Sequence, residues 1–309
     1  MKRKTEVSEL IFKIVAYLFL TIFALMCLYP LIFALSSAFS SNEAVNGSKV
    51  VLWPVGLQGK AFLHVLKDNV FWIGYSNTIF ITFFGTLWSL GYSILGAYAL
   101  SKKRLLGRHG FNFFLVFTMW FSAGVIPTFQ NYYHTSQIFS SIGIEDLKWT
   151  VVIAMGMNAT NIILLRNSFE GVPSEIEEAA RIDGATELQI LTKVYIPMSK
   201  ATIATVALFF GISRWNGYFW AMRVMGTDQK SSWPVQVYIR NFLDEYTTIS
   251  GTPSPEATNN ISKWDKTYSY SAVSVLYSMV VCAVIPILAI YPFIQKYFAK
   301  GVNMGGVKE

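Results

Sequence analysis

Six long runs of apolar residues limit what this 309-residue chain can fold into. Each run reaches or exceeds the roughly 20 residues that cross the hydrocarbon core of a bilayer. The runs are Leu10–Phe39, Phe71–Leu100, Phe111–Gln130, Thr150–Phe169, Thr202–Met222 and Ser271–Gln295. A backbone surrounded by lipid must satisfy its own hydrogen bonds, and these runs are too long for barrel strands. The sequence therefore predicts an all-α polytopic membrane protein with six transmembrane helices, forming a single transmembrane domain over residues 1–309.

The composition supports a membrane protein and argues against soluble classes. Apolar residues make up 53% of the chain and charged residues only 14%, whereas soluble domains carry about 25% charged residues. The net charge of +7 does not come from a basic stripe or tail, so no nucleic-acid partner is expected. Cys27 and Cys282 both lie inside apolar runs, which predicts neither a disulfide framework nor a metal site.

Basic residues predict the orientation of the spans. They are densest in the short segment Lys102–Arg108, and loops rich in Lys and Arg stay in the cytoplasm. Both termini are then expected to be cytoplasmic. An alternative is that the first run is a cleaved signal, because Ser36-Ser37-Ala38 loosely resembles a cleavage site. The run is longer than the apolar region of a signal peptide, which favours a span.

The six runs contain no Asp, Glu or His. Proton-coupled carriers need ionisable groups within the membrane, and an intramembrane hydrolase needs a nucleophile beside a base. No catalytic residue is therefore predicted. A sodium-coupled carrier that uses hydroxyls and carbonyls, or a simple pore, remains open as a self-contained alternative.

The connection Glu170–Lys200 is the one long cytoplasmic loop and predicts a helical hairpin. Ser174 is expected to cap the first helix, with Glu177 completing a capping box. Gly184 is expected at a positive φ in the turn, and Pro197 ends the second helix. The first helix carries a stripe of small and apolar residues: Ile176, Ala179 and Ala180. Such a hairpin is either a surface element or a docking element for a partner protein.

Within this loop, Glu178-Ala179-Ala180, Gly184 and Val194-Tyr195-Ile196-Pro197 resemble the EAA loop of ABC importer permeases. That loop has the form E-A-A, three residues, G, nine residues, I-x-L-P, so Val194 and Ile196 stand in for Ile and Leu. The string EEAARIDGA is similar to sugar permeases of the maltose type. Further stretches resemble the subfamily that serves complex oligosaccharides: Leu52-Trp53-Pro54, Asn77-Thr78, Trp215-Asn216, Tyr291–Phe298 and Lys300–Lys308.

The resemblance implies a type I ABC importer transmembrane-domain fold and a subunit of an oligosaccharide importer in a bacterial cell membrane. The implied partners are a second homologous permease, an ABC ATPase dimer and an extracellular solute-binding protein. The chain has no Gly-x-x-x-x-Gly-Lys-[Ser/Thr] motif, so ATP and Mg²⁺ are expected on the partner ATPase and no cofactor on this chain. It is then not an enzyme itself. A permease for another solute is the alternative within the class.

The resemblance also implies which residues couple the spans to the ATPase. They lie in the coupling loop 170–200 and in the cytoplasmic tail 296–309: Glu178, Ala179, Ala180, Asp183, Gly184, Pro197, Gly301, Gly305 and Gly306.

Polar and aromatic residues in the fourth and fifth runs are candidates for a sugar path, because aromatic faces stack on sugars and amides bond their hydroxyls. They are Asn158, Asn161, Arg214, Trp215, Asn216, Tyr218 and Trp220. The alternatives are an interfacial aromatic belt, helix–helix contacts of the two asparagines and snorkelling of Arg214 to the outer surface. Acidic and basic residues nearly balance outside the membrane, which gives no reason to expect an acidic substrate.

Overall fold

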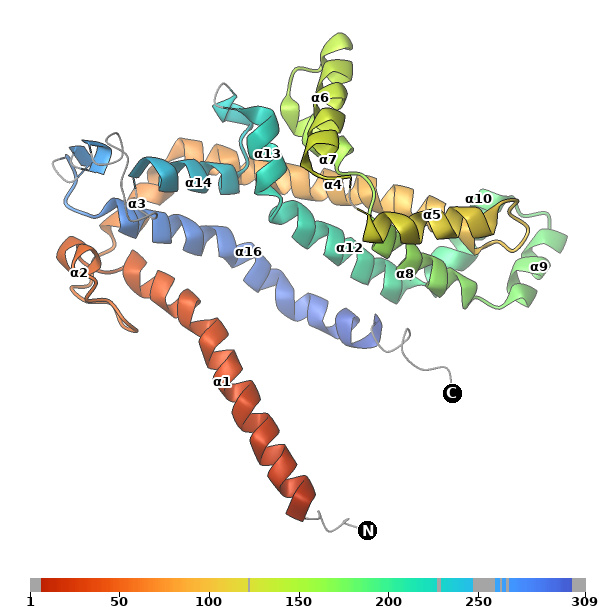
Figure 1. The fold of residues 1–309 in the computed structure, drawn as a ribbon, viewed down its shortest axis with the longest axis horizontal. Helices are drawn as coiled ribbons and strands as arrows, with labels where there is room; N and C mark the ends of the chain where they lie inside the picture. Colours follow the sequence, from red (N-terminus) through yellow and green to blue (C-terminus); the bar gives the residue numbers. More distant parts are fainter. Residues whose placement is uncertain are drawn as a thin grey trace. The chain divides into compact units, whose positions relative to one another are not determined.

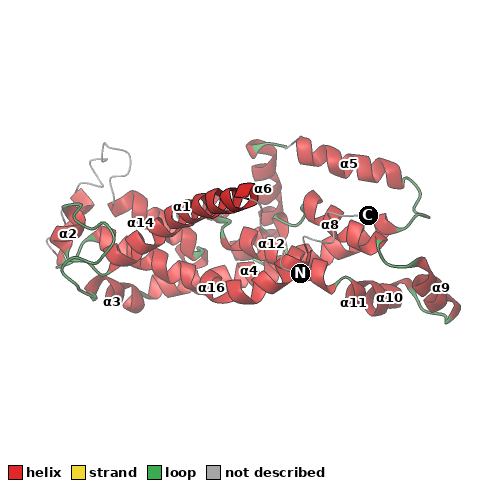
Figure 2. Cartoon of the chain, turned by 90° about the horizontal axis from the view of Figure 1, so that it is seen from below, coloured by secondary structure: helices red, strands yellow, loops and turns green. Residues whose placement is uncertain are grey.

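The computed structural model describes residues 7–121, 123–226, 229–246, 259–261, 263–264 and 267–301. Every regular element in these residues is a helix, which confirms the all-α prediction (Figure 2). The chain divides into two compact units, one of residues 1–71 with 239–285 and the other of residues 72–238 with 286–309.

The first unit combines the N-terminal helices with segments from the C-terminal third. It contains α1 (Val7–Ala38), α2 (Asn42–Asn46), α3 (Lys60–Lys67), the end of α14 (Val235–Tyr246) and the first half of α16 (Ala272–Gly301). The Phe33 ring on α1 lies edge-on to Tyr277 on α16, with 5.5 Å between their centroids. Near α3, the hydroxyl of Tyr270 lies 2.9 Å from His64 Nδ1. Aromatic contacts thus connect segments distant in sequence.

The second unit is built on α4 (Asn69–Ser101), of which all but the first turn belongs to it (Figure 1). The other helices follow in chain order: α5 (Arg108–Trp120), α6 (Val125–Ser141), α7 (Leu147–Ala154), α8 (Ala159–Glu170), α9 (Ser174–Ile182), α10 (Glu187–Ile190), η1 (Leu191–Tyr195), α11 (Ile196–Met198), α12 (Lys200–Trp215), α13 (Tyr218–Met225) and η2 (Lys230–Ser232). One apolar core joins α4, α8, α12 and the 187–198 segment, and a second joins α4, α7, α13 and α14.

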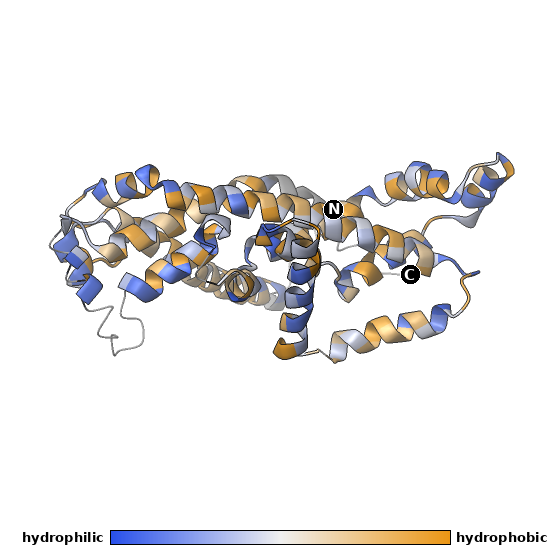
Figure 3. Ribbon diagram, turned by 90° about the horizontal axis from the view of Figure 1, so that it is seen from above, coloured by the Kyte–Doolittle hydropathy of each residue, from blue (hydrophilic) through white to orange (hydrophobic). Residues whose placement is uncertain are grey.

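Three helices are long and apolar enough to cross a membrane unaided: Glu9–Ala38, Asn69–Ser101 and Ala272–Pro292. Figure 3 shows hydrophobic residues in orange, interspersed with paler ones, along the long helices. Pro30, Pro286 and Pro292 lie inside such helices without ending them. Up to six spans result if each bent pair of shorter helices counts as one.

The third, fourth and fifth apolar runs are not continuous helices, contrary to the sequence prediction. The third ends α5 at Trp120, and α6 begins after Gly124, whose φ of +84° only glycine adopts readily. The fourth is broken between α7 and α8, which meet at 51°. The fifth is broken at Asn216 and Gly217 between α12 and α13. Residues that favour turns and caps thus interrupt helices that apolarity alone would have continued.

Candidate functional site

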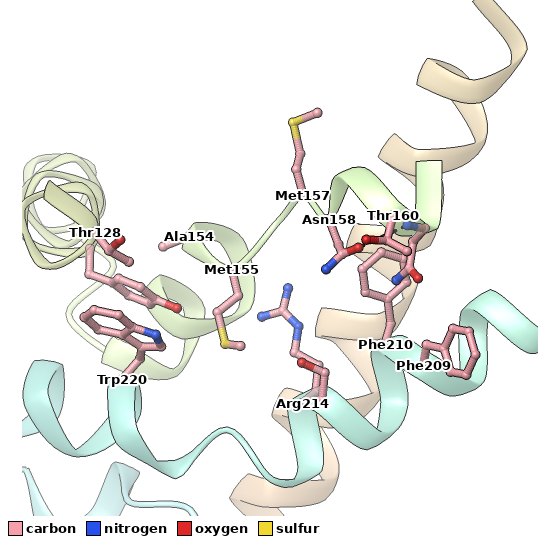
Figure 4. Close-up of a pocket in the computed structure, with 13 residues that line it drawn as sticks. Thr128, Ala154, Met155, Met157, Asn158, Thr160, Phe209, Phe210, Arg214 and Trp220 are labelled. Carbon is pink, nitrogen blue, oxygen red and sulfur yellow. Dashed lines mark hydrogen bonds between the residues drawn. The ribbon is translucent and has the colours of Figure 1, made fainter. Parts of the chain in front are cut away.

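A cavity of about 530 Å³ lies in the second unit beside the break between α7 and α8 (Figure 4). Its walls come from α6, α8, α12 and α13 as well as from the break itself. Four predicted sugar-path residues line it: Asn158, Asn161, Arg214 and Trp220. Its volume falls in the range of small-molecule sites, so the structure brings part of the predicted set together around one space.

Arg214 is the charged residue of this cavity. It is only 4% exposed, so it does not snorkel to the outer surface. Nη1 donates to the Val151 carbonyl at 2.8 Å and Nη2 donates to Ser89 Oγ at 2.7 Å. Val151 lies in the last turn of α7, where carbonyls lack helical partners. Arg214 therefore joins α12 to α4 and α7, and Figure 4 shows its guanidinium pointing into the space between Met155 and Asn158.

The start of α8 faces the same cavity. Asn158 is its N-cap, and the Asn158 side chain accepts a hydrogen bond from the Asn161 backbone N–H at 3.0 Å. Asparagine is among the best residues for this position. Asn158 is exposed whereas Asn161 is buried. Both asparagines thus have a structural role at the helix start in addition to lining the cavity.

A stacked aromatic pair forms the opposite wall. Tyr132 from α6 and Trp220 from α13 lie with their centroids 5.3 Å apart and their planes 14° from parallel. Tyr132 is 1% exposed, so its position is fixed by packing. The cavity therefore has a cationic and polar end and an aromatic end.

The other predicted sugar-path residues do not line this cavity. The half-buried Trp215 packs edge-on against Tyr75 of α4, with 6.1 Å between centroids. Asn216 is the exposed C-cap of α12. Tyr218 is the exposed first residue of α13. These residues are close to Arg214 in sequence, but Trp215 contacts α4, and Asn216 and Tyr218 lie at the break between α12 and α13.

Sequence reasoning missed the other nine of the 13 cavity residues, among them Tyr132 and Ser213. Tyr132 lies beyond the end of the third apolar run, at Gln130, whereas α6 continues to Ser141. The available signal was Gly156 with Asn158 inside an apolar run, because a glycine followed by a cap residue marks a helix break.

A second candidate site is the hairpin of residues 174–198. Contrary to the predicted capping box, Ser174 is already the first helical residue, and Pro173 precedes it without a side-chain cap. The capping box instead starts α10, where Thr186 and Gln189 bond each other's backbone. The Glu177 side chain therefore does not cap the start of α9, and it bonds other side chains instead.

The turn between α9 and α10 closes as predicted around Gly184, whose φ is +78°. The Gly184 N–H donates to the Arg181 carbonyl and the Ala185 N–H donates to the Ala180 carbonyl, each at 3.0 Å. These two bonds form a Schellman motif, which requires the left-handed conformation at Gly184. Further along, the Ile196 N–H bonds the Leu191 carbonyl five residues back, so the turn before Pro197 is a π-helix.

Lys102, just after α4, holds the hairpin through Glu177. Its Nζ lies 2.8 Å from Glu177 Oε2 and 3.9 Å from the centroid of the Tyr195 ring. Tyr195 and Arg181 also donate hydrogen bonds to Glu177. Burial alone would raise the pKa of Glu177, but the bonds from Lys102 and Tyr195 outweigh burial and place the pKa below its ordinary value. Burial lowers the pKa of Lys102 despite the pairing, because its side chain is the more buried of the two.

The predicted coupling residues divide between the two faces of the hairpin. Glu178, Ala179 and Asp183 are exposed, whereas Ala180 packs against the apolar core. Large apolar side chains are also exposed on this hairpin: Ile176 at 41%, Ile182 at 87% and Leu188 at 66%. Pro197 lies in α11, and Gly301 is the last residue of α16. Gly305 and Gly306 lie outside the described residues.

Comparison with known proteins identifies the class. The family described as "Binding-protein-dependent transport system inner membrane component" matches residues 3–304. The chain is 35% identical over 306 residues to the polygalacturonan/rhamnogalacturonan transport system permease protein YtcP of Bacillus subtilis (strain 168), covering 96% of this chain and 98% of YtcP. It is 30% identical to protein LplC of the same strain, covering 96% of this chain and 95% of LplC.

A solved structure agrees with these relatives. The crystal structure of a bacterial ABC transporter involved in the import of the acidic polysaccharide alginate contains a chain 43% identical to this one, with a TM-score of 0.79. The match covers 95% of this chain and 98% of that one. With the family match extending over nearly the whole chain, the chain belongs to the family of binding-protein-dependent transport system inner membrane components and is a permease of the ABC importer class.

Proposed function

We propose that this chain forms half of the translocation pathway of an ATP-driven oligosaccharide importer. YtcP is named for polygalacturonan and rhamnogalacturonan, and the structural relative belongs to an alginate importer. Oligosaccharides are the substrate class that we infer for this chain. The cavity beside Arg214 and Trp220 is the place where a passing sugar would contact it.

The partners we infer are a second homologous permease, an ABC ATPase dimer and an extracellular solute-binding protein. ATP and Mg²⁺ belong to the ATPase, since this sequence has no phosphate-binding loop motif. The hairpin of residues 174–198 is cytoplasmic in this arrangement, as are both termini. Its Glu178, Ala179, Asp183 and Gly184 would meet the ATPase.

The coupling role is supported by a difference between the two sides of the hairpin: one side is attached to the rest of the chain and the other is exposed. One side is attached to the end of α4 through Lys102 and Glu177. On the other, Ile182 is 87% exposed. A protein interface has an apolar core surrounded by a polar rim, and an exposed isoleucine beside charged residues fits that pattern. A displacement of the docked ATPase would therefore reach α4 and, through η1 and α11, reach α12.

The test is to replace Ile182 in the assembled transporter. We expect Ile182→Glu to lower both the amount of co-purifying ATPase and ATP-dependent oligosaccharide uptake into proteoliposomes, because a buried charge disrupts an apolar contact. Leu106→Glu is the matched control, since Leu106 is 92% exposed in the loop after α4. Equal ATPase recovery and uptake in both variants would contradict the docking role. Uptake by the purified chain alone, driven by a sodium gradient, would overturn the importer assignment.

A further inference from the structure

The cavity in the second unit is positive, and its charge has no protein counterpart. Arg214 supplies a full positive charge and is nine-tenths or more buried. The residues that line the cavity, all within the described part of the chain, include no Asp or Glu. Charged groups within a membrane normally pair with one another or mark the path of a substrate.

The known contacts of Arg214 leave hydrogen-bonding capacity unused. A guanidinium has five N–H donors, and the contacts to the Val151 carbonyl and Ser89 Oγ occupy one on each terminal nitrogen. Both acceptors are neutral. The arginine is therefore hydrogen-bonded but not neutralised.

The N-terminus of α8 adds positive potential at the same cavity. This helix has 12 residues, and its N-terminal residues Asn158, Thr160 and Asn161 line the space. The Asn158 side chain satisfies the Asn161 N–H. Among the described residues, the N–H groups of Ala159 and Thr160 have no acceptor. A helix start with free N–H groups favours an anion.

We propose that Arg214 and the start of α8 bind a carboxylate of the passing sugar, so that the substrate is an acidic, uronate-containing oligosaccharide. This inference rests on the proposed function as an oligosaccharide importer. A guanidinium can bind a carboxylate through two parallel hydrogen bonds. The Tyr132–Trp220 pair supplies an aromatic wall for a sugar ring in the same cavity. Arg214 thereby sets the preference for a charged over a neutral substrate.

A purely structural role for Arg214 is the competing explanation. Its contacts join α12 to α4 and α7, so its removal also loosens helix packing. The two roles differ in one respect, because only substrate binding makes transport sensitive to other charges placed in the cavity. Ser213 offers such a position, since it lines the cavity and is exposed.

The experiment measures uptake of tri-galacturonate by the assembled transporter in proteoliposomes with its loaded binding protein. We expect Ser213→Asp to reduce uptake roughly tenfold or more relative to Ser213→Asn, because the added carboxylate repels the substrate carboxylate and competes with it for Arg214. The loss of one hydrogen bond to a charged group has an effect of this size. Arg214→Gln should reduce uptake by at least the same factor. Arg214→Lys should reduce uptake less, because lysine keeps the positive charge but cannot form the two parallel hydrogen bonds of a guanidinium. Arg223→Gln is the control, since Arg223 is exposed and does not line the cavity.

Stimulation of ATP hydrolysis by the loaded binding protein is measured in parallel, and Arg223→Gln should leave it unchanged. Equal uptake by the two Ser213 variants would overturn the carboxylate site. So would a wild-type transporter that moves maltotriose or arabinotriose but not tri-galacturonate, while the proposed importer function would stand. Failure of the wild-type complex to move any of these sugars would instead contradict the proposed function.

Discussion

At the scale of single residues, Gly184 determines whether the hairpin of residues 174–198 can close. A Cβ added there would meet no atom within 4 Å, so a substitution causes no steric clash with the rest of the chain. Its only free-energy cost is that of holding a residue with a side chain at a positive φ. That cost is roughly 1–2 kcal/mol for an ordinary residue and smaller for asparagine, which tolerates the left-handed conformation. We expect uptake to fall in the order Gly184, Gly184→Asn, Gly184→Ala, Gly184→Val. Measuring ATPase stimulation alongside uptake checks this, and a Gly184→Val transporter equal to Gly184→Asn would contradict it.

Ala180 shows how a residue prediction changes once the fold is known. The sequence placed Ala180 in one docking stripe with Ile176 and Ala179, since all three share a helix face at that spacing. In the structure Ile176 and Ala179 are exposed and Ala180 packs against the chain's own core. A large side chain at Ala180 would therefore disturb the packing of the hairpin first. Ile182 is the more direct position for testing ATPase docking.

At the scale of elements, the attachment of α9 to the end of α4 depends on Lys102. We expect Lys102→Met to loosen the hairpin by about 1–3 kcal/mol, because it leaves the Glu177 carboxylate without a buried charge partner. Hydrogen exchange of the α9 amides in the assembled complex measures this loosening. Arg104→Met is the control, because the Arg104–Glu187 pair is about half exposed and such pairs contribute below about 1 kcal/mol. Equal exchange in both variants would refute a special role for Lys102.

At the scale of the whole molecule, the topology is open to direct measurement. After Cys27 and Cys282 are replaced by alanine, a single cysteine is introduced at Leu106 or at Leu57. Both positions are strongly exposed, at 92% and 79%. We expect a membrane-impermeant thiol reagent to label Leu106→Cys only from the cytoplasmic side and Leu57→Cys only from outside, following the basic residues of the Lys102–Arg108 segment. Labelling of both from one side would show that a span was miscounted.

The sequence was sufficient for the class of fold and for the turn at Gly184, and less so for the cavity. The length of an apolar run predicts a span because the thickness of the bilayer sets the length that a spanning helix needs. The Gly184 turn is predictable because it depends only on neighbouring residues in the chain. The cavity depends on where helices stop. Gly124, Asn158 and Gly217 interrupt three runs whose average hydropathy gives no sign of a break. The contacts of Lys102 join the end of α4 to α9 and η1 across a long sequence separation, which no local pattern can report.

Gly85 on α4 has a consequence for how related sequences can diverge. A Cβ on Gly85 would lie 3.0 Å from both Cδ and Nε of Arg214. Position 85 therefore needs a glycine because the Arg214 side chain already fills the space that a larger residue would occupy. The two positions should covary: homologues that keep arginine at 214 should keep glycine at 85, and those with a smaller residue at 214 should accept alanine or serine there. A packing defect caused by Gly85→Ala, measured as lower abundance of the protein in the membrane, should likewise be relieved by a smaller residue at position 214, whereas uptake of tri-galacturonate should stay low because the charge is lost.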